Sequence, residues 1–149
     1  MDLETLHTEW QKDCRIDILK LQEESAKTFT LHSKYSRLLS KEKITLSALE
    51  QTLKKHKFDL TNDLEGNDVL PDFKQIAKDY RAEKERFKKL SKGEIESLVE
   101  NNDDTRKLHL KINLSKEKIR FLESILRFLL DRTFAIKNII DHNKYQNGM

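Results

Sequence analysis

Glycine and proline, the residues that most often interrupt helices, are almost absent from this chain. Its 149 residues include three glycines and one proline. A fold made of many strands needs frequent turns, and these two residues commonly form them. From Leu3 to about Leu60, apolar residues also recur at the spacing of a helix. The sequence therefore predicts an all-α protein.

Two antiparallel helices are predicted in the first two thirds of the chain. The first is expected to begin after Asp2, which can cap it, and to allow a break near Ser40. The run Glu65-Gly66-Asn67-Asp68, followed by a proline, is the clearest stop signal. A second helix is predicted over residues 72–92. Together they would form a long, coiled-coil-like helical hairpin over residues 1–92.

Residues 93–114 are predicted to form an acidic connection, because residues 93–104 hold five acidic and no basic side chains. Leucine or isoleucine at positions 108, 110, 112 and 114 then alternates with polar residues. This alternation is typical of a short β element near 108–114. A frayed helix explains the same residues equally well, so both interpretations remain open.

A last helix is predicted over residues 115–142, with two apolar seams where a helix in a hairpin needs one. Burial on two sides suits a helix packed between neighbouring subunits, so we expect this helix to drive oligomerisation. The alternative is the central core helix of a monomer. The residues expected to make the contacts between subunits are Ile119, Leu122, Ile125, Leu126, Phe128, Leu129, Ile136, Ile139 and Ile140.

The composition agrees with narrow seams that are buried partly against other copies. Charged residues make up 37% of the chain and hydrophobic residues 36%, which is highly charged for a monomer with one compact core. The length fits a single domain, residues 1–149. The first residues lack the apolar centre of a signal peptide, and the most apolar stretch, 119–140, carries six charged side chains. We therefore expect a cytoplasmic protein without a transmembrane helix.

Patterns that support catalysis or metal binding are missing from the sequence. No two of the five histidines have the spacing of metal ligands, and Cys14, the single cysteine, is expected to pack in the seam of the first helix. Three dispersed glycines cannot build a phosphate-binding loop. An enzyme is thus the weakest hypothesis, and neither a cofactor nor a metal is expected.

Two groups of basic residues favour nucleic-acid binding instead. Lys54, Lys55 and Lys57 lie next to Phe58 near the end of the first helix. Clustered lysines neutralise phosphates, and an aromatic ring can stack on a base without reading its identity. The alternative is an ordinary solvated helix end, where lysine also complements the helix dipole. The second group is a stripe on the predicted helix 72–92 and consists of Lys74, Lys78, Arg81 and Lys88.

Spaced residues near both ends of the chain form a further pattern. Near the N-terminus they include Lys12-Asp13, Ile16-Asp17, Lys20-Leu21-Gln22 and Ser33-Lys34-Tyr35. Near the C-terminus they are Phe134-Ala135-Ile136-Lys137 with Ile139 and Asp141. This pattern resembles the UvsY family, the recombination mediators of T-even-like bacteriophages. The resemblance is tight over 1–39 and 132–141 and loose over the rest of the chain.

The resemblance implies a ring-shaped homo-oligomer of six or seven subunits without catalytic activity. It implies that single-stranded DNA is the ligand and that there are two protein partners. One is a phage RecA-like recombinase (UvsX type), which is loaded onto the strand. The other is the phage single-strand-binding protein, which is displaced.

The resemblance also implies roles for particular residues. A basic-x-basic-apolar-Asp stretch contributes to DNA binding in the family, and residues 55–59 match it, so Lys55 and Lys57 inherit this role. The family's C-terminal helix drives oligomerisation, which agrees with the two seams. The expected location is the cytoplasm of the infected bacterial host. A non-catalytic coiled-coil adaptor that binds acidic protein surfaces remains the alternative function.

Overall fold

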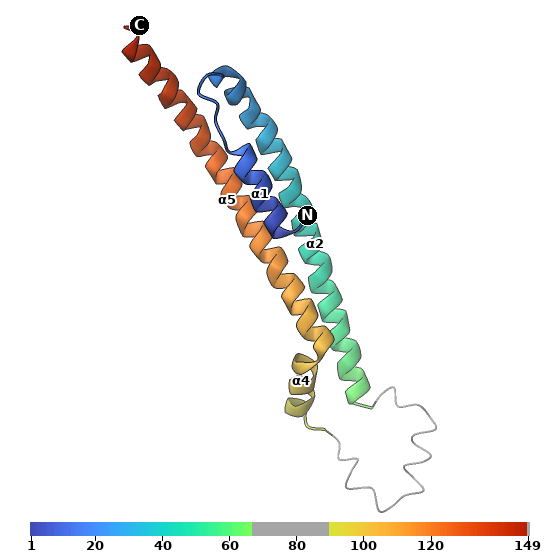
Figure 1. Ribbon diagram of the computed structural model, residues 1–149. Coiled ribbons are helices and arrows are strands. Elements are labelled where there is room, and N and C mark those ends of the chain that lie inside the picture. The colour runs from blue at the N-terminus through green and yellow to red at the C-terminus, as the bar shows by residue number, and fades with distance from the viewer. Residues whose placement is uncertain (67–89, 149) are drawn as a thin grey trace, which may run out of the picture. The chain divides into compact units, whose positions relative to one another are not determined.

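The computed structural model describes residues 1–66 and 90–148 and is built from helices (Figure 1). These helices are α1 (Leu3–Asp13), α2 (Leu21–Leu64), α4 (Lys92–Asn101) and α5 (Asp103–Gln146). No strand occurs among the described residues. The prediction of an all-α fold is confirmed.

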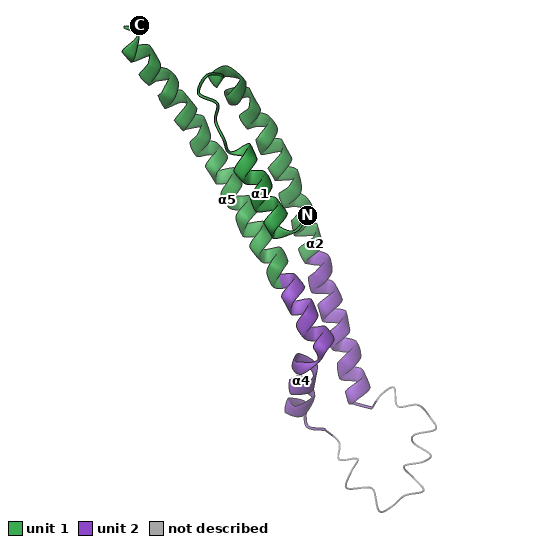
Figure 2. Ribbon diagram, in the orientation of Figure 1, with its two compact units in different colours: residues 1–46, 113–149 green, residues 47–112 purple. Residues whose placement is uncertain are grey.

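The chain divides into two compact units, which Figure 2 shows in different colours. Unit 1 contains residues 1–46 and 113–149, and unit 2 contains residues 47–112. The two long helices, α2 and α5, each contribute residues to both units. In each unit, segments that are far apart in the sequence are therefore packed together.

The helical interruption near the N-terminus lies at residues 14–20, and the predicted break near Ser40 is wrong. Asp2 caps α1 as predicted, because its carboxylate accepts a hydrogen bond from the backbone N–H of Thr5 at 2.7 Å. Ser40 stays inside α2, where its hydroxyl bonds the Ser36 carbonyl one turn back. Cys14 is the exposed C-cap of α1 and is not packed in a seam as expected.

The core of unit 1 forms where α1 folds back onto α2 and α5. Its buried residues come from all three helices: Leu6, Leu31, Tyr35, Leu122, Ile125 and Leu129. Trp10 of α1 packs its ring edge-to-face on Tyr35, with centroids 5.4 Å apart. The α5 seam is thus buried within one chain over this region, as the monomer-core alternative expects.

Polar contacts fix the arrangement of the helices around this core. The phenol of Tyr35 and the ammonium of Lys34 each donate to Asp13 Oδ2 at 2.8 Å, which ties the end of α1 to α2. Further along, Glu42 of α2 accepts a hydrogen bond from Ser115 of α5 at 2.7 Å and pairs with Lys118 at 3.3 Å. The side chains of Glu42 and Lys118 are 15% and 18% exposed, so shifting one helix along the other would leave two partly desolvated charges without their partners, and the pair favours one alignment.

The predicted stop after α2 is confirmed. This helix ends at Leu64, and Gly66 adopts a φ of 76°, a left-handed conformation that glycine accepts without a Cβ clash. Most of the predicted helix 72–92 lies outside the described residues. Its predicted end is wrong, because Leu90 and Ser91 are not helical and a new helix begins at Lys92.

Helix α4 replaces the first part of the expected acidic connection, and α5 replaces most of the rest. Its start is a capping box: Ser91 accepts from the backbone of Glu94, and Glu94 bonds back to the backbone of Ser91. Ile95 and Val99, four residues apart, are its buried side chains. Glu94, Glu96 and Glu100 therefore lie on the exposed side of a helix whose apolar side is buried in unit 2.

Helix α5 begins at Asp103, well before the predicted start near residue 115. The side chain of Asn102 caps it by accepting from the backbone N–H groups of Asp104 and Thr105, at 3.0 and 3.3 Å. The β interpretation of residues 108–114 is wrong, and the helical alternative is right. Ile112 is buried while Leu110 and Leu114 are exposed, so alternate residues do not share one face.

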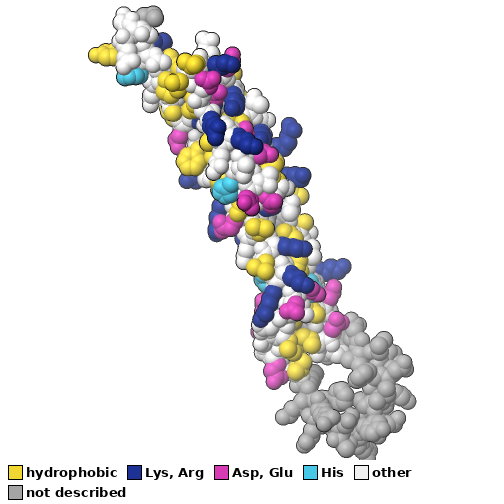
Figure 3. Space-filling view, in the orientation of Figure 1, with side chains coloured by type: hydrophobic (Ala, Val, Ile, Leu, Met, Phe, Trp, Pro, Cys, Tyr) yellow, Lys and Arg dark blue, Asp and Glu magenta, His cyan; other side chains and the backbone are white. Residues whose placement is uncertain are grey.

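The described helices do not include one that is both long and apolar enough to cross a membrane. Basic and acidic side chains alternate over the face that Figure 3 shows, without a large area of one sign. A nucleic-acid interface on this face must therefore be a local cluster of residues.

Candidate nucleic-acid interface

Lys54, Lys55 and Phe58 form an exposed cluster on α2. Phe58 follows Lys54 by four residues and Lys55 by three, and these spacings place all three side chains on one face of a helix. The ring of Phe58 is 65% exposed, although burying it would be favourable. Within the described residues, neither lysine has an ion-pair partner in the protein. We call these three residues the outer cluster.

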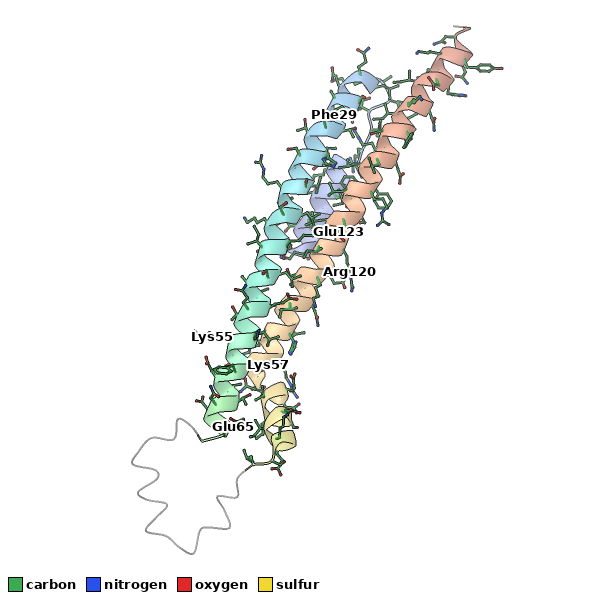
Figure 4. All side chains as sticks on the ribbon, turned by 180° about the vertical axis from the view of Figure 1, so that it is seen from behind. Phe29, Lys55, Lys57, Glu65, Arg120 and Glu123 are labelled. Atoms are coloured by element: carbon green, nitrogen blue, oxygen red, sulfur yellow. The ribbon has the colours of Figure 1, made fainter. Side chains whose placement is uncertain are left out.

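Lys57 does not join the outer cluster, although the sequence grouped it with the other two lysines. Figure 4 shows Lys55 and Lys57 leaving different sides of α2. The ammonium of Lys57 donates a hydrogen bond to Glu100 on α4, and its side chain is 31% exposed. The matching stretch at residues 55–59 thus contains one lysine open to solvent and one held by an acid.

Glu100 lies close to side chains from two other helices, α2 and α5. Its Oε1 accepts from Lys57, and its Oε2 lies 3.5 Å from His109 Nε2 on α5. The hydrogen bond from Lys57, reinforced by the Lys57 charge, lowers the pKa of Glu100 despite a small opposing effect of desolvation. The carboxylate is therefore ionised and bound to Lys57 at neutral pH.

Asn102 holds the Glu100 side of this contact in place. Besides capping α5, its Oδ1 lies 3.4 Å from His56 Nε2 on α2. Asn102, at the junction between α4 and α5, therefore contacts His56, the residue before Lys57 in α2. Sequence spacing could not reveal this arrangement, since Glu100 lies 43 residues from Lys57.

The second predicted group of basic residues, Lys74, Lys78, Arg81 and Lys88, lies outside the described residues. The structure therefore leaves their predicted role in DNA binding untested.

The residues predicted to mediate oligomerisation differ in their exposure. Those buried within the protomer are Leu122, Ile125, Leu129 and Ile136. Ile119, Leu126, Ile139 and Ile140 are half-buried. Phe128 alone of this set is well exposed, at 55%. It lines a pocket of about 320 Å³ with Trp10, Ile16 and Arg132. The role of the predicted oligomerisation residues between subunits stays a prediction.

The chemistry of the outer cluster suits binding of a flexible polyanion. The ammonium groups of Lys54 and Lys55, which have no ion-pair partner within residues 1–66 and 90–148, can contact phosphates, and the exposed ring of Phe58 beside them can stack on a base. In the part of the chain that the structure describes, no three His, Cys, Asp or Glu side chains gather as a metal site would require.

Comparisons with known proteins identify the family and the fold. Residues 9–149 match the model of a family described as "Recombination, repair and ssDNA binding protein UvsY". Two crystal structures of the bacteriophage T4 recombination mediator protein UvsY are similar in fold. One (lattice type IV) has a TM-score of 0.79 at 24% identity, covering 98% of this chain and 99% of the other. The second (lattice type II) has a TM-score of 0.75 at 25% identity, covering 99% and 98%. Curated protein sequences give no match.

Proposed function

Because the chain belongs to the UvsY family, we propose that it is a recombination mediator that binds single-stranded DNA through the outer cluster on α2. In this role it promotes loading of a RecA-like phage recombinase onto strands covered by single-strand-binding protein. Binding and presentation of the strand require no bond to be made or broken, so no catalytic residue is involved. The process takes place in the cytoplasm of the infected bacterial host.

The observation that carries this proposal is the exposure of Phe58 beside Lys54 and Lys55, neither of which pairs with an acidic side chain among the described residues. An exposed phenylalanine contributes nothing to the core of its own chain, and it offers a stacking surface that tolerates any base. Lys54 and Lys55, three and four residues before it, place positive charge where the phosphates of a stacked strand would run. The family description, which includes single-stranded DNA binding, agrees with this chemistry.

We propose that the ligand-binding form is a ring of six or seven copies. A ring would repeat the outer cluster around its circumference, and a strand that contacts several copies gains affinity through effective concentration. Exposed apolar side chains on α5, Phe128 among them, are available to a second copy. A weak site on one subunit could therefore hold a strand firmly in the oligomer.

The proposal is tested by removing both outer lysines. Lys54→Gln with Lys55→Gln should weaken binding of a labelled oligo-dT and should flatten its log–log dependence on salt by about 0.7 per lost phosphate contact. Lys137→Gln with Lys144→Gln is the matched control, since both residues are exposed on α5 and the change in net charge is the same. If both double variants lost the same affinity for oligo-dT, the change in net charge would explain the loss, and the assigned site would be contradicted.

A further inference from the structure

We propose that Glu100 competes with the DNA backbone for Lys57, so that α4 restrains one of the two motif lysines until a strand displaces the carboxylate. This inference rests on the proposed function and concerns the regulation of the same site. It assigns to the acidic helix α4 a role in tuning affinity for single-stranded DNA.

The contact resembles the one that a phosphate would make. A carboxylate oxygen of Glu100 accepts a hydrogen bond from the Lys57 ammonium, as a phosphate oxygen does. Lys57 is two residues from Lys55 and one residue from Phe58, but on a different side of α2, so a strand bound at the outer cluster must extend around the helix to reach it. Glu100 holds the ammonium toward α4 and neutralises its charge, so a phosphate gains the full attraction of Lys57 only when Glu100 gives way.

The position of Glu100 is unfavourable for α4 itself. Glu100 lies in the last turn of the helix, where no basic side chain is present and the negative end of the dipole disfavours a carboxylate. Lys57, from α2, offsets this disadvantage. The carboxylate is thus held by a partner on another helix and not by its own helix.

The contact is also one that a ligand can break. The side chains of Lys57 and Glu100 are 31% and 55% exposed, so water can solvate both groups when they separate. Exposed ion pairs of this kind contribute little free energy, and salt screens them. A polyanion with many phosphates can therefore displace a single carboxylate.

The matching experiment uses Glu100→Gln in the full chain, with binding of a labelled oligo-dT measured over a salt series. We expect roughly two- to five-fold tighter binding at low salt, since an exposed ion pair is released. The log–log slope should stay the same, because the strand displaces the carboxylate in the unaltered chain too and so makes the same number of phosphate contacts. Glu96→Gln is the matched control, because it removes the same charge from an exposed position of α4. It should leave both quantities unchanged.

A Lys57→Gln chain tests whether the gain in affinity from Glu100→Gln depends on Lys57. In a Lys57→Gln chain, Glu100→Gln should produce no gain, because no lysine is released. A gain of the same size in that background, or in Glu96→Gln, would overturn the inference, as would unchanged binding by Glu100→Gln with an unchanged circular dichroism spectrum. If the unaltered chain fails to bind oligo-dT at low salt, the proposed function itself fails. Normal binding without any response to Glu100→Gln overturns only the restraint by Glu100.

Discussion

The guanidinium of Arg132 on α5 donates a hydrogen bond to the carboxylate of Glu24 in the first turn of α2, and both side chains are withdrawn from solvent, at 4% and 13% exposure. The other donors of Arg132 bond the carbonyls of Cys14 and Arg15 at 3.1 and 3.3 Å and the hydroxyl of Thr28 at 3.2 Å. One side chain therefore fastens the connection between α1 and α2 to both long helices. A planar group with five donors suits this task better than an ammonium would.

Replacing Arg132 by methionine should destabilise the protein by about 3–5 kcal/mol, because it leaves the carboxylate of Glu24 buried without a counter-charge. The measurement is chemical unfolding at one fixed protomer concentration, since oligomerisation would shift the apparent stability. Arg127→Met is the control, as Arg127 is exposed on the same helix. A loss of stability no larger than that of the control would contradict the structural role given to Arg132.

Asp13 should make the stability of the protein depend on pH in acid. Burial alone would raise the pKa of Asp13, but the hydrogen bonds from Lys34 and Tyr35 outweigh burial and hold the pKa below its ordinary value. A carboxyl group with a lowered pKa stabilises the fold above its unfolded pKa, near 3.8, and loses this effect as the pH falls through the folded pKa.

Asp13→Asn is therefore expected to cost about 1.5–3 kcal/mol at pH 7, the usual range for hydrogen bonds to a charged group. The difference from the unaltered chain should shrink as the pH falls through the lowered pKa of Asp13 in the folded protein, because the carboxyl group is then protonated in both states. Unfolding curves across this range test the prediction, with Asp131→Asn as an exposed control. A difference that does not vary with pH would show that the charge of Asp13 is not what matters.

Phe58→Ala should weaken binding of single strands by about 1–3 kcal/mol for the loss of one stacked base. The thermal stability should hardly change, since the ring is 65% exposed. Phe29→Ala is a matched control, because Phe29 lies on the same helix and is 79% exposed (Figure 4). If both variants bind equally well, stacking on Phe58 is not part of the mechanism.

Self-association should depend on the exposed side of α5. Phe128→Ser is expected to reduce the mass of the oligomer in sedimentation velocity, because Phe128 is exposed in the protomer and open to a second copy. Leu129→Ala should instead cost about 2–5 kcal/mol of folding stability, since Leu129 is 1% exposed in the core of unit 1. Phe29→Ser serves as the control for an exposed phenylalanine on α2. An oligomer that resists Phe128→Ser would place the contact elsewhere.

Local signals in the sequence were sufficient for much of the fold. Apolar spacing predicted the helices, and the caps at Asp2 and Gly66 were visible because each uses a residue type with a known local role. The capping box that starts α4, Ser91 with Glu94, is also present in the sequence. It was missed because the acidic composition of the segment favoured a connection over a helix. The alternation of residues 108–114 was misleading because four apolar residues at period two also place pairs four apart on a helix.

Other features depend on contacts that no local pattern specifies. The break at residues 14–20 contains no glycine or proline, and it is stabilised by the packing of α1 against α2 and α5 and by the bonds of Arg132. In the candidate site, the sequence predicted the exposed Lys55 and Phe58 together with Lys57. It could not separate Lys57 from them, because the partner of Lys57 belongs to a helix much further along the chain.

The most direct test of the account is the affinity of the unaltered chain for a labelled poly-pyrimidine single strand, measured over a salt series beside a duplex of the same length. We predict tight binding that prefers the single strand and weakens steeply as salt increases, because stacking needs unpaired bases and the lysines release counterions. No binding at low salt, or a preference for the duplex, would contradict the account and leave an adaptor for acidic protein partners as the better description.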